Sequence, residues 1–191
     1  MLWGGNKGTL EVRAEGGATH LRAVFPYGSE TELAPGRLEV IAPRAFADRI
    51  ENGSEIHLLA GHSYDKPLAS RSAGTLHLTD TDEALEIRAT LDDGTTWARD
   101  FLAAHGSGLI KGLSPGFRVA KGGETIERRG AGMLRTIGKA DLFELSAVTR
   151  PAYPAAQIEA RAWETSERSE TSARAENAVS GLHRTLNRWR A

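Results

Sequence analysis

The chain has 191 residues, of which 40% are hydrophobic and 26% are charged, and its formal net charge is −1. This balance is typical of a folded globular protein and argues against a disordered chain. A charge so near zero gives no overall electrostatic reason to expect nucleic acid as a partner. The absence of cysteine excludes disulfides, thiol nucleophiles and cysteine metal sites.

Strands predominate among the predicted elements. Residues 9–25 alternate apolar and polar side chains around Gly16 and Gly17, which is the pattern of a β-hairpin. A second hairpin is predicted where the acidic turn at residues 80–83 separates two further alternating segments. In chain order the expected strands cover residues 9–14, 19–25, 37–41, 55–60, 74–78, 84–91, 117–119, 133–137 and 140–149.

Two short helices are predicted between these strands. One begins at Pro43, a residue that favours the first helical position, and stops at Gly53. The other follows capping side chains at residues 92–96, carries Trp97 and Phe101 on one face, and ends at Gly106.

Two segments are expected to lie outside regular structure. Pro67 interrupts the strand pattern that precedes it, because proline has no backbone N–H for a sheet ladder. The polar, glycine-rich segment at residues 121–132 is predicted to form an exposed loop.

The last part of the chain differs in composition. Residues 164–177 are mostly Glu, Ser, Thr, Arg and Ala without an apolar stripe, and the segment after them is predicted to be a short amphipathic helix. We expect a β-rich domain over residues 1–160, and a polar connector with a C-terminal amphipathic helix over residues 161–191. That helix either packs on its own domain or docks on a partner.

No cofactor or membrane span is predicted. The chain has no glycine-rich phosphate loop and no histidine cluster with metal-ligand spacing. It also has no run of about 18 apolar residues, and its first residues lack the basic start and apolar core of an export signal.

Ser114 is the strongest nucleophile candidate. It stands between Gly112 and Gly116 in the segment LIKGLSPGFRV, a pattern that suggests the nucleophile elbow of an α/β-hydrolase. That elbow takes an N–H from the next residue and leads into a helix, whereas Pro115 follows here and has no N–H. An esterase of that type is therefore disfavoured, and Ser114 is predicted to precede a strand. Its hydroxyl is a nucleophile only if a base reaches it.

His62 and Glu144 are the best candidates for partners of this serine. Among the six histidines, His62 lies in a loop entered through a glycine at the end of an apolar strand. His57 and His77 lie inside strand patterns and His105 ends a helix, which favours structural roles for them. Glu144 interrupts an apolar run, so it either faces solvent or pairs with a cation such as an imidazolium.

Four stretches of the chain carry a family resemblance. They are RLEVIAPRAF at residues 37–46, LLAGHSYDKPLA at 58–69, KGLSPGFRV at 111–119 and DLFELSAVTRPAYPAAQ at 141–157. In this order, and over about residues 21–161, they resemble the prohead maturation proteases of tailed phages. Four stretches in the right order are a far stronger signal than any one of them.

The resemblance implies an α+β, mainly β fold similar to that of the herpesvirus assemblins, with a compact antiparallel β-barrel and short helices around it. It implies a serine endopeptidase inside the procapsid, in the host cytoplasm, that cleaves the scaffolding segment from the major capsid protein and trims itself. Those capsid proteins are the expected partners, a homodimer is left open, and no cofactor is implied. The alternative is a catalytically inactive capsid-assembly or scaffold-binding protein.

Carried over by position, the family's histidine falls on His62 and its GLS serine on Ser114. Its late acidic residue falls on Glu144, with Asp141 as the rival. Residues three apart on a regular strand face opposite sides, so at most one of the two carboxylates can face His62. Glu144 is preferred because Asp141 lies nearer the start of the element, where a capping or turn role is expected.

In the implied mechanism His62 takes the proton of Ser114, and Glu144 orients the charged imidazole. The oxyanion donors are not identified. Pro115 cannot supply one, which leaves the N–H of Gly116 or a donor near Arg150 as candidates.

Overall fold

The computed structural model describes residues 9–15 and 18–149. Strands dominate this part of the chain, which confirms the mainly β prediction. In chain order the elements are β1 (Thr9–Glu15), β2 (Ala18–Pro26), β3 (Thr31–Ala34), β4 (Arg37–Ile41), α1 (Ala47–Glu51), β5 (His57–Ala60), β6 (Ser63–Ser70), β7 (Leu76–Asp80), β8 (Ala84–Leu91), α2 (Thr96–Gly106), β9 (Gly112–Val119), β10 (Glu124–Arg129), β11 (Gly132–Ile137) and β12 (Ala140–Val148).

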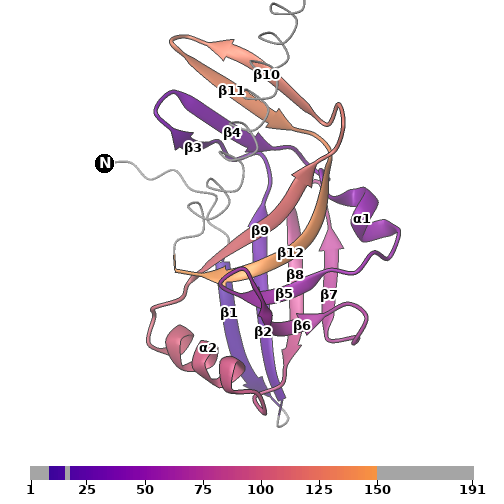
Figure 1. Ribbon diagram of the computed structural model, residues 1–191, viewed down its shortest axis with the longest axis vertical. Coiled ribbons are helices and arrows are strands. Elements are labelled where there is room, and N and C mark those ends of the chain that lie inside the picture. Colours follow the sequence, from indigo (N-terminus) through magenta and orange to yellow (C-terminus); the bar gives the residue numbers. More distant parts are fainter. Residues whose placement is uncertain (1–8, 16–17, 150–191) are drawn as a thin grey trace, which may run out of the picture. The chain divides into compact units, whose positions relative to one another are not determined.

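The strands form three sheets of four strands each (Figure 1). The first sheet has the order β1-β2-β8-β7, the second β10-β11-β4-β3 and the third β6-β5-β12-β9. The two predicted hairpins, β1–β2 and β7–β8, lie side by side in the first sheet through the pairing of β2 with β8.

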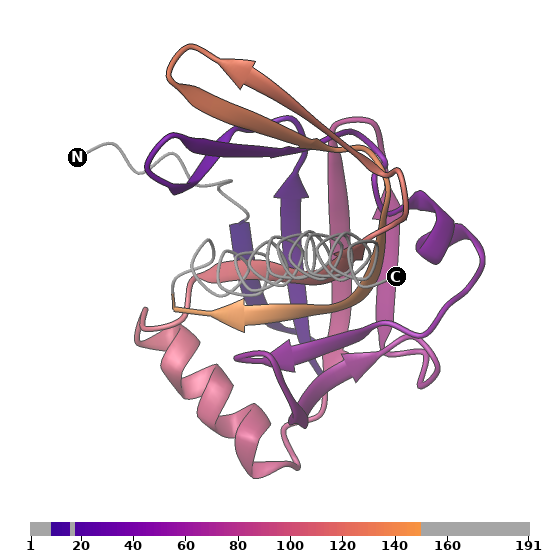
Figure 2. The ribbon, with the colours of Figure 1, turned by 45° about the horizontal axis from the view of Figure 1, so that its top comes forward.

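The core lies between the first and third sheets. Leu21 and Ile87 reach it from the first sheet, Leu58 and Leu145 from the third, and each is at most 1% exposed. Figure 2 shows the strands of the third sheet crossing in front of the upright strands of the first. Burial of this apolar surface is the main favourable contribution to folding, and it gives the third sheet one face in the core and one face outside it.

The helices agree with the predictions to different degrees. The Thr95 side chain caps α2 by accepting a hydrogen bond of 3.3 Å from the N–H of Ala98, and Phe101 packs into the core as expected. α1 is shorter than predicted. It begins at Ala47 because residues 43–46 form turns in which Arg44 has a φ of 56°, a left-handed conformation that an α-helix cannot contain.

The closed antiparallel barrel is not found. Among the described residues all three sheets are open, and two pairs of strands, β11 with β4 and β12 with β5, run parallel. Both edge strands of the third sheet carry a proline, Pro67 on β6 and Pro115 on β9. A proline has no N–H to offer a further strand, so these edges do not invite closure.

Two segments predicted to be irregular are strands. β6 continues through Pro67, which is tolerated because β6 is an edge strand whose register with β5 shifts twice. Residues 124–129 form β10, which is exposed along its whole length and pairs with β11. Since β10 buries neither face, its sequence shows no alternation from which a strand could be predicted.

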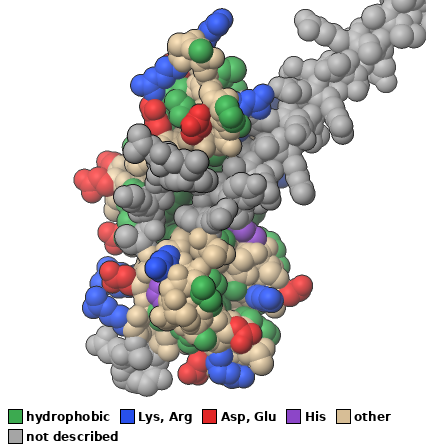
Figure 3. Space-filling model, turned by 90° about the vertical axis from the view of Figure 1, so that its left-hand side faces the viewer, with side chains coloured by type: hydrophobic (Ala, Val, Ile, Leu, Met, Phe, Trp, Pro, Cys, Tyr) green, Lys and Arg blue, Asp and Glu red, His purple; other side chains and the backbone are tan. Residues whose placement is uncertain are grey.

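The predicted connector, the C-terminal amphipathic helix, the domain boundary at residue 160 and Arg150 lie outside the described residues. Within the described part, neither helix is long and apolar enough to cross a membrane. On the face seen in Figure 3, acidic and basic side chains of the described residues are interspersed rather than gathered by sign.

Candidate active site

The outer face of the third sheet carries the candidate residues. On β9, Leu113 belongs to the core, so Ser114 projects from the opposite face, as does Gly116 two residues later. The antiparallel register with β12 places Ser146 opposite Ser114 and Glu144 opposite Gly116. Two neighbouring strands thus bring the serine and the carboxylate onto one surface.

His62 enters this surface at the tip of the β5–β6 hairpin. Gly61 and His62 form its two-residue turn with φ values of 65° and 60°, the combination that a type I′ hairpin requires. The turn is tied to β12 by two hydrogen bonds. The N–H of Gly61 donates to the carbonyl of Ala147 (3.1 Å), and the N–H of His62 donates to the hydroxyl of Ser146 (3.0 Å).

The His62 ring is paired with the Glu144 carboxylate. Nδ1 lies 2.8 Å from Oε1, and because a carboxylate only accepts hydrogen bonds, Nδ1 is the donor. In the neutral imidazole Nε2 then carries the lone pair. The second carboxylate oxygen, Oε2, accepts a hydrogen bond of 2.5 Å from the Ser146 hydroxyl. Glu144 is 5% exposed, and these two contacts supply the partners that a buried carboxylate needs.

Two buried polar atoms of this surface have no hydrogen-bond partner among the described residues: Nε2 of His62 and Oγ of Ser114. Buried polar groups without a partner are rare in folded proteins, and they often mark functional positions. The two atoms do not hydrogen-bond each other in this structure. Ser114 is fully buried, and His62 is partly buried.

Gly116 makes room for the Glu144 carboxylate. A Cβ at position 116 would lie 1.9 Å from Oε1, far inside van der Waals contact. Position 116 therefore requires a residue without a side chain. It lies inside β9, and Ser114 also lies within that strand rather than before it as predicted.

The prediction that Asp141 and Glu144 lie on opposite faces is wrong. The register of β12 against β9 shifts between residues 142 and 144, so Phe143 is an extra residue in a β-bulge. With this bulge both carboxylates lie on the same face of the sheet. Asp141 is nevertheless apart from the histidine, since it is opposite Arg118 and forms an ion pair of 3.2 Å with it.

Comparison with known proteins identifies a family for the chain. A family model described as "Caudovirus prohead serine protease" matches residues 9–171, a range that includes Ser114, His62 and Glu144. The chain belongs to the caudovirus prohead serine proteases. It is therefore a serine protease of phage capsid maturation, a process that takes place within the procapsid. No curated protein and no solved structure matches the chain.

Around the histidine of this protease, charges of both signs are close. Partial burial and then the negative charge of Glu144 raise the pKa of Tyr64, while Arg49 acts in the opposite direction. The Arg49 guanidinium lies 5.0 Å from the ring centre of Phe143. The Tyr64 phenol is thus under the influence of both the Glu144 carboxylate and the Arg49 guanidinium.

Sequence reasoning missed Ser146. Its hydroxyl accepts from the backbone of His62 and donates to the side chain of Glu144, so it links the two residues. The signal was present, because Ser146 is the second polar residue in the apolar run LFELSAV and stands two positions after Glu144. Residues two apart on a strand share a face.

The described residues also contain no group of three or more His, Asp or Glu side chains arranged to hold a metal ion.

Proposed function

We propose that the chain is the endopeptidase that cleaves the scaffolding segment from the major capsid protein and trims itself, inside the procapsid and within the host cytoplasm. In this proposal Ser114 is the nucleophile, His62 the general base and Glu144 the group that orients the histidine. The observation that carries the proposal is the His62–Glu144 hydrogen bond of 2.8 Å, on a sheet face where Nε2 and the Ser114 hydroxyl are both left without partners.

The roles follow from the protons that these groups can hold. Glu144 fixes the proton on Nδ1, which leaves Nε2 free to accept the proton of the Ser114 hydroxyl as Oγ attacks the scissile carbonyl. The imidazolium then donates that proton to the leaving amine as the peptide bond breaks. A water molecule, deprotonated by the same nitrogen, then attacks the acyl carbon; the bond from that carbon to Oγ breaks, and the imidazolium returns the proton to Oγ.

Ser146 and Gly116 would act by positioning. The Ser146 hydroxyl holds the hairpin tip through the His62 N–H and holds the carboxylate through Oε2. The absence of a side chain at Gly116 lets Glu144 lie flat enough against β9 to reach the ring. An error of about 1 Å in such an arrangement can cost about a hundredfold in rate.

The burial of the Ser114 hydroxyl means that the proposed reaction requires a change in the structure. Ser114 is fully buried, so the outer face of the third sheet has to open before the capsid precursor can bind.

The test is co-expression of the chain with its major capsid protein precursor, with products identified by mass spectrometry. The wild-type chain is expected to remove the scaffolding segment, and the Ser114→Ala chain is expected to leave it intact while still folding. Ser107→Ala, at an exposed serine that follows α2, is the matched control and should process normally.

Continued processing by the Ser114→Ala chain would defeat the proposal. If the wild-type chain binds to shells but processes nothing, the alternative function of an inactive capsid-assembly or scaffold-binding protein is favoured instead.

A further inference from the structure

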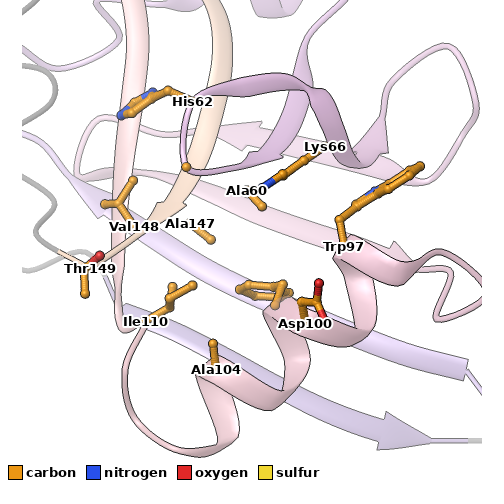
Figure 4. Close-up of a pocket in the computed structure, with 12 residues that line it drawn as sticks. Ala60, His62, Lys66, Trp97, Asp100, Ala104, Ile110, Ala147, Val148 and Thr149 are labelled. Carbon is orange, nitrogen blue, oxygen red and sulfur yellow. The ribbon is translucent and has the colours of Figure 1, made fainter.

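A pocket of about 760 Å³ opens beside the His62 turn, between α2 and the ends of β5 and β12 (Figure 4). Most of its wall is apolar. The apolar side chains that line it are Ala60, Phe101, Ala104, Ile110, Ala147 and Val148. Its volume is in the range of pockets that bind small ligands or several atoms of a peptide.

The pocket wall on α2 comes from one stripe of the helix. Trp97, Phe101 and Ala104 stand at positions i, i+4 and i+7, which share a helix face, and all three line the pocket. Figure 4 shows Asp100 and Ala104 of α2 on one side of the pocket and Ala147 and Val148 on the other, with His62 also among the lining residues. Apolar surface left open next to a reacting residue is what a substrate side chain can cover.

The pocket is held in shape without a ligand. The Trp97 ring nitrogen donates a hydrogen bond of 2.7 Å to the carbonyl of Pro67, which ties α2 to β6. The Gly61 N–H ties the hairpin turn to Ala147 on the opposite wall. A preformed pocket loses little conformational freedom on binding, which favours recognition.

The charged groups at the pocket do not select a charged ligand. Lys66 and Asp100 both line it, both are exposed, and within the described residues no ion pair joins them. Because both groups are exposed, solvent and salt screen their charges, and neither provides a buried partner for a charged side chain. The apolar wall is then the feature that distinguishes one residue from another.

We propose that this pocket binds a bulky apolar side chain of the substrate polypeptide, of the Leu, Ile, Met or Phe class, within about four residues of the scissile bond. The distance limit follows because His62 lines the pocket and an extended peptide advances about 3.3 Å per residue. The inference rests on the proposed function, since it takes His62 as the base that acts on the scissile bond.

The test compares two matched variants of the full chain. Ala104→Phe fills the pocket, whereas Ala103→Phe places the same ring on the neighbouring, exposed position of α2. Cleavage of a peptide library is read by mass spectrometry for the wild type and both variants. The wild type is expected to prefer a bulky apolar residue at one position near the cleaved bond.

In the Ala104→Phe variant kcat/KM should fall about tenfold or more for peptides with a bulky residue at that position, and should be unchanged for peptides with alanine there. The Ala103→Phe variant should match the wild type. If Ala104→Phe does not fold, Ile110→Ala enlarges the same pocket and should shift the preference toward larger side chains.

A separate binding measurement distinguishes failure of this inference from failure of the proposed function. Fluorescence anisotropy with the Ser114→Ala chain should show tighter binding of peptides that carry the bulky residue, and Ala104→Phe should abolish the difference. Ser114-dependent cleavage with an unchanged preference in Ala104→Phe would overturn the pocket assignment alone. Binding that depends on Ala104 without any cleavage by the wild type would overturn the protease proposal alone, and loss of both would overturn both.

Discussion

At the residue scale, three side chains on two elements determine the geometry of the site. The Glu144 carboxylate uses one oxygen for the His62 ring and the other for the Ser146 hydroxyl. Hydrogen bonds to a charged group contribute about 1.5–3 kcal/mol each, and a buried carboxylate without them would be costly. The same contacts therefore stabilise the fold and would orient His62 in its proposed role as the base.

The space at Gly116 gives a sharp prediction. In Gly116→Ala the new Cβ would lie 1.9 Å from Oε1 of Glu144, so the carboxylate has to move away from His62. We expect kcat to fall about tenfold or more while the chain stays folded by circular dichroism. Gly106→Ala, at the end of α2 where a Cβ meets nothing within 4 Å, is the control and should keep full activity. Wild-type kcat in Gly116→Ala would show that the carboxylate position does not matter.

A second residue-scale prediction concerns Asp80, which lies outside the site. Burial raises the pKa of Asp80 above its ordinary value of 3.8, although its hydrogen bond with Tyr27 acts in the opposite direction. The folded chain thus binds this proton more tightly than the unfolded chain does. The stability that Asp80 contributes is full below pH 3.8 and is lost as the pH rises through the folded-state pKa.

Asp80→Asn should therefore be more stable than the wild type at pH 7, by less than about 1 kcal/mol because Asp80 is partly exposed and solvent screens its charge. The difference should shrink toward pH 4. Urea unfolding at the two pH values measures it. A variant that is less stable at pH 7, or a difference that does not change with pH, would contradict the assignment.

The three residues chosen from the sequence lie close together in the structure, but the predicted local geometry was partly wrong. His62, Ser114 and Glu144 lie on or beside one sheet face, and the ring of His62 contacts the carboxylate that was preferred. Asp141 was predicted to face away from Glu144. That prediction was wrong because a one-residue bulge reverses the alternation, and the sequence DLFEL does not indicate a bulge.

At the element scale, the β5–β6 hairpin is the part of the fold that places the histidine. Its two-residue turn has both φ values in the left-handed region, which is easy for Gly61 and less favourable for His62. The conformation is held by the two hydrogen bonds from the turn to β12.

This turn gives a third prediction. Gly61→Ala should lower stability by about 1 kcal/mol, because alanine disfavours a left-handed φ. It should also reduce kcat several-fold, because the turn carries His62. Gly130→Ala in the β10–β11 hairpin has a φ of 63° and equal space for a Cβ, so it should lose similar stability and keep its activity. Equal loss of activity in both variants would mean that stability alone explains the effect.

The elements that were predicted well bury one face and expose the other. β2, β8 and α2 show this pattern, since apolar side chains recur with the period of a strand or a helix. Two strands were not predicted. β10 has no buried face, and β6 includes a proline, which a sheet tolerates only on an edge strand. Edge position is a property of the assembled sheet, so it is not visible in a local pattern.

At the scale of the described domain, the strand content could be predicted from the sequence. The pairing of the strands into three open sheets could not. Alternation shows which face of each strand is buried, but the pairing of strands distant in the chain depends on the whole fold. The parallel pairs β4–β11 and β5–β12 join segments separated by about eighty residues or more. The third sheet is open, each of its edge strands carries a proline that cannot donate a hydrogen bond to a further strand, and the candidate site lies on its outer face.

The most direct test of the central claim is fluorophosphonate labelling of the chain in assembled procapsids, with the adduct located by mass spectrometry. A fluorophosphonate reacts with a serine that a neighbouring base activates. We predict one adduct, on the peptide that contains Ser114, and its loss in the His62→Gln chain. An unlabelled Ser114 in processing-competent shells, or equal labelling in the His62→Gln chain, would contradict the account.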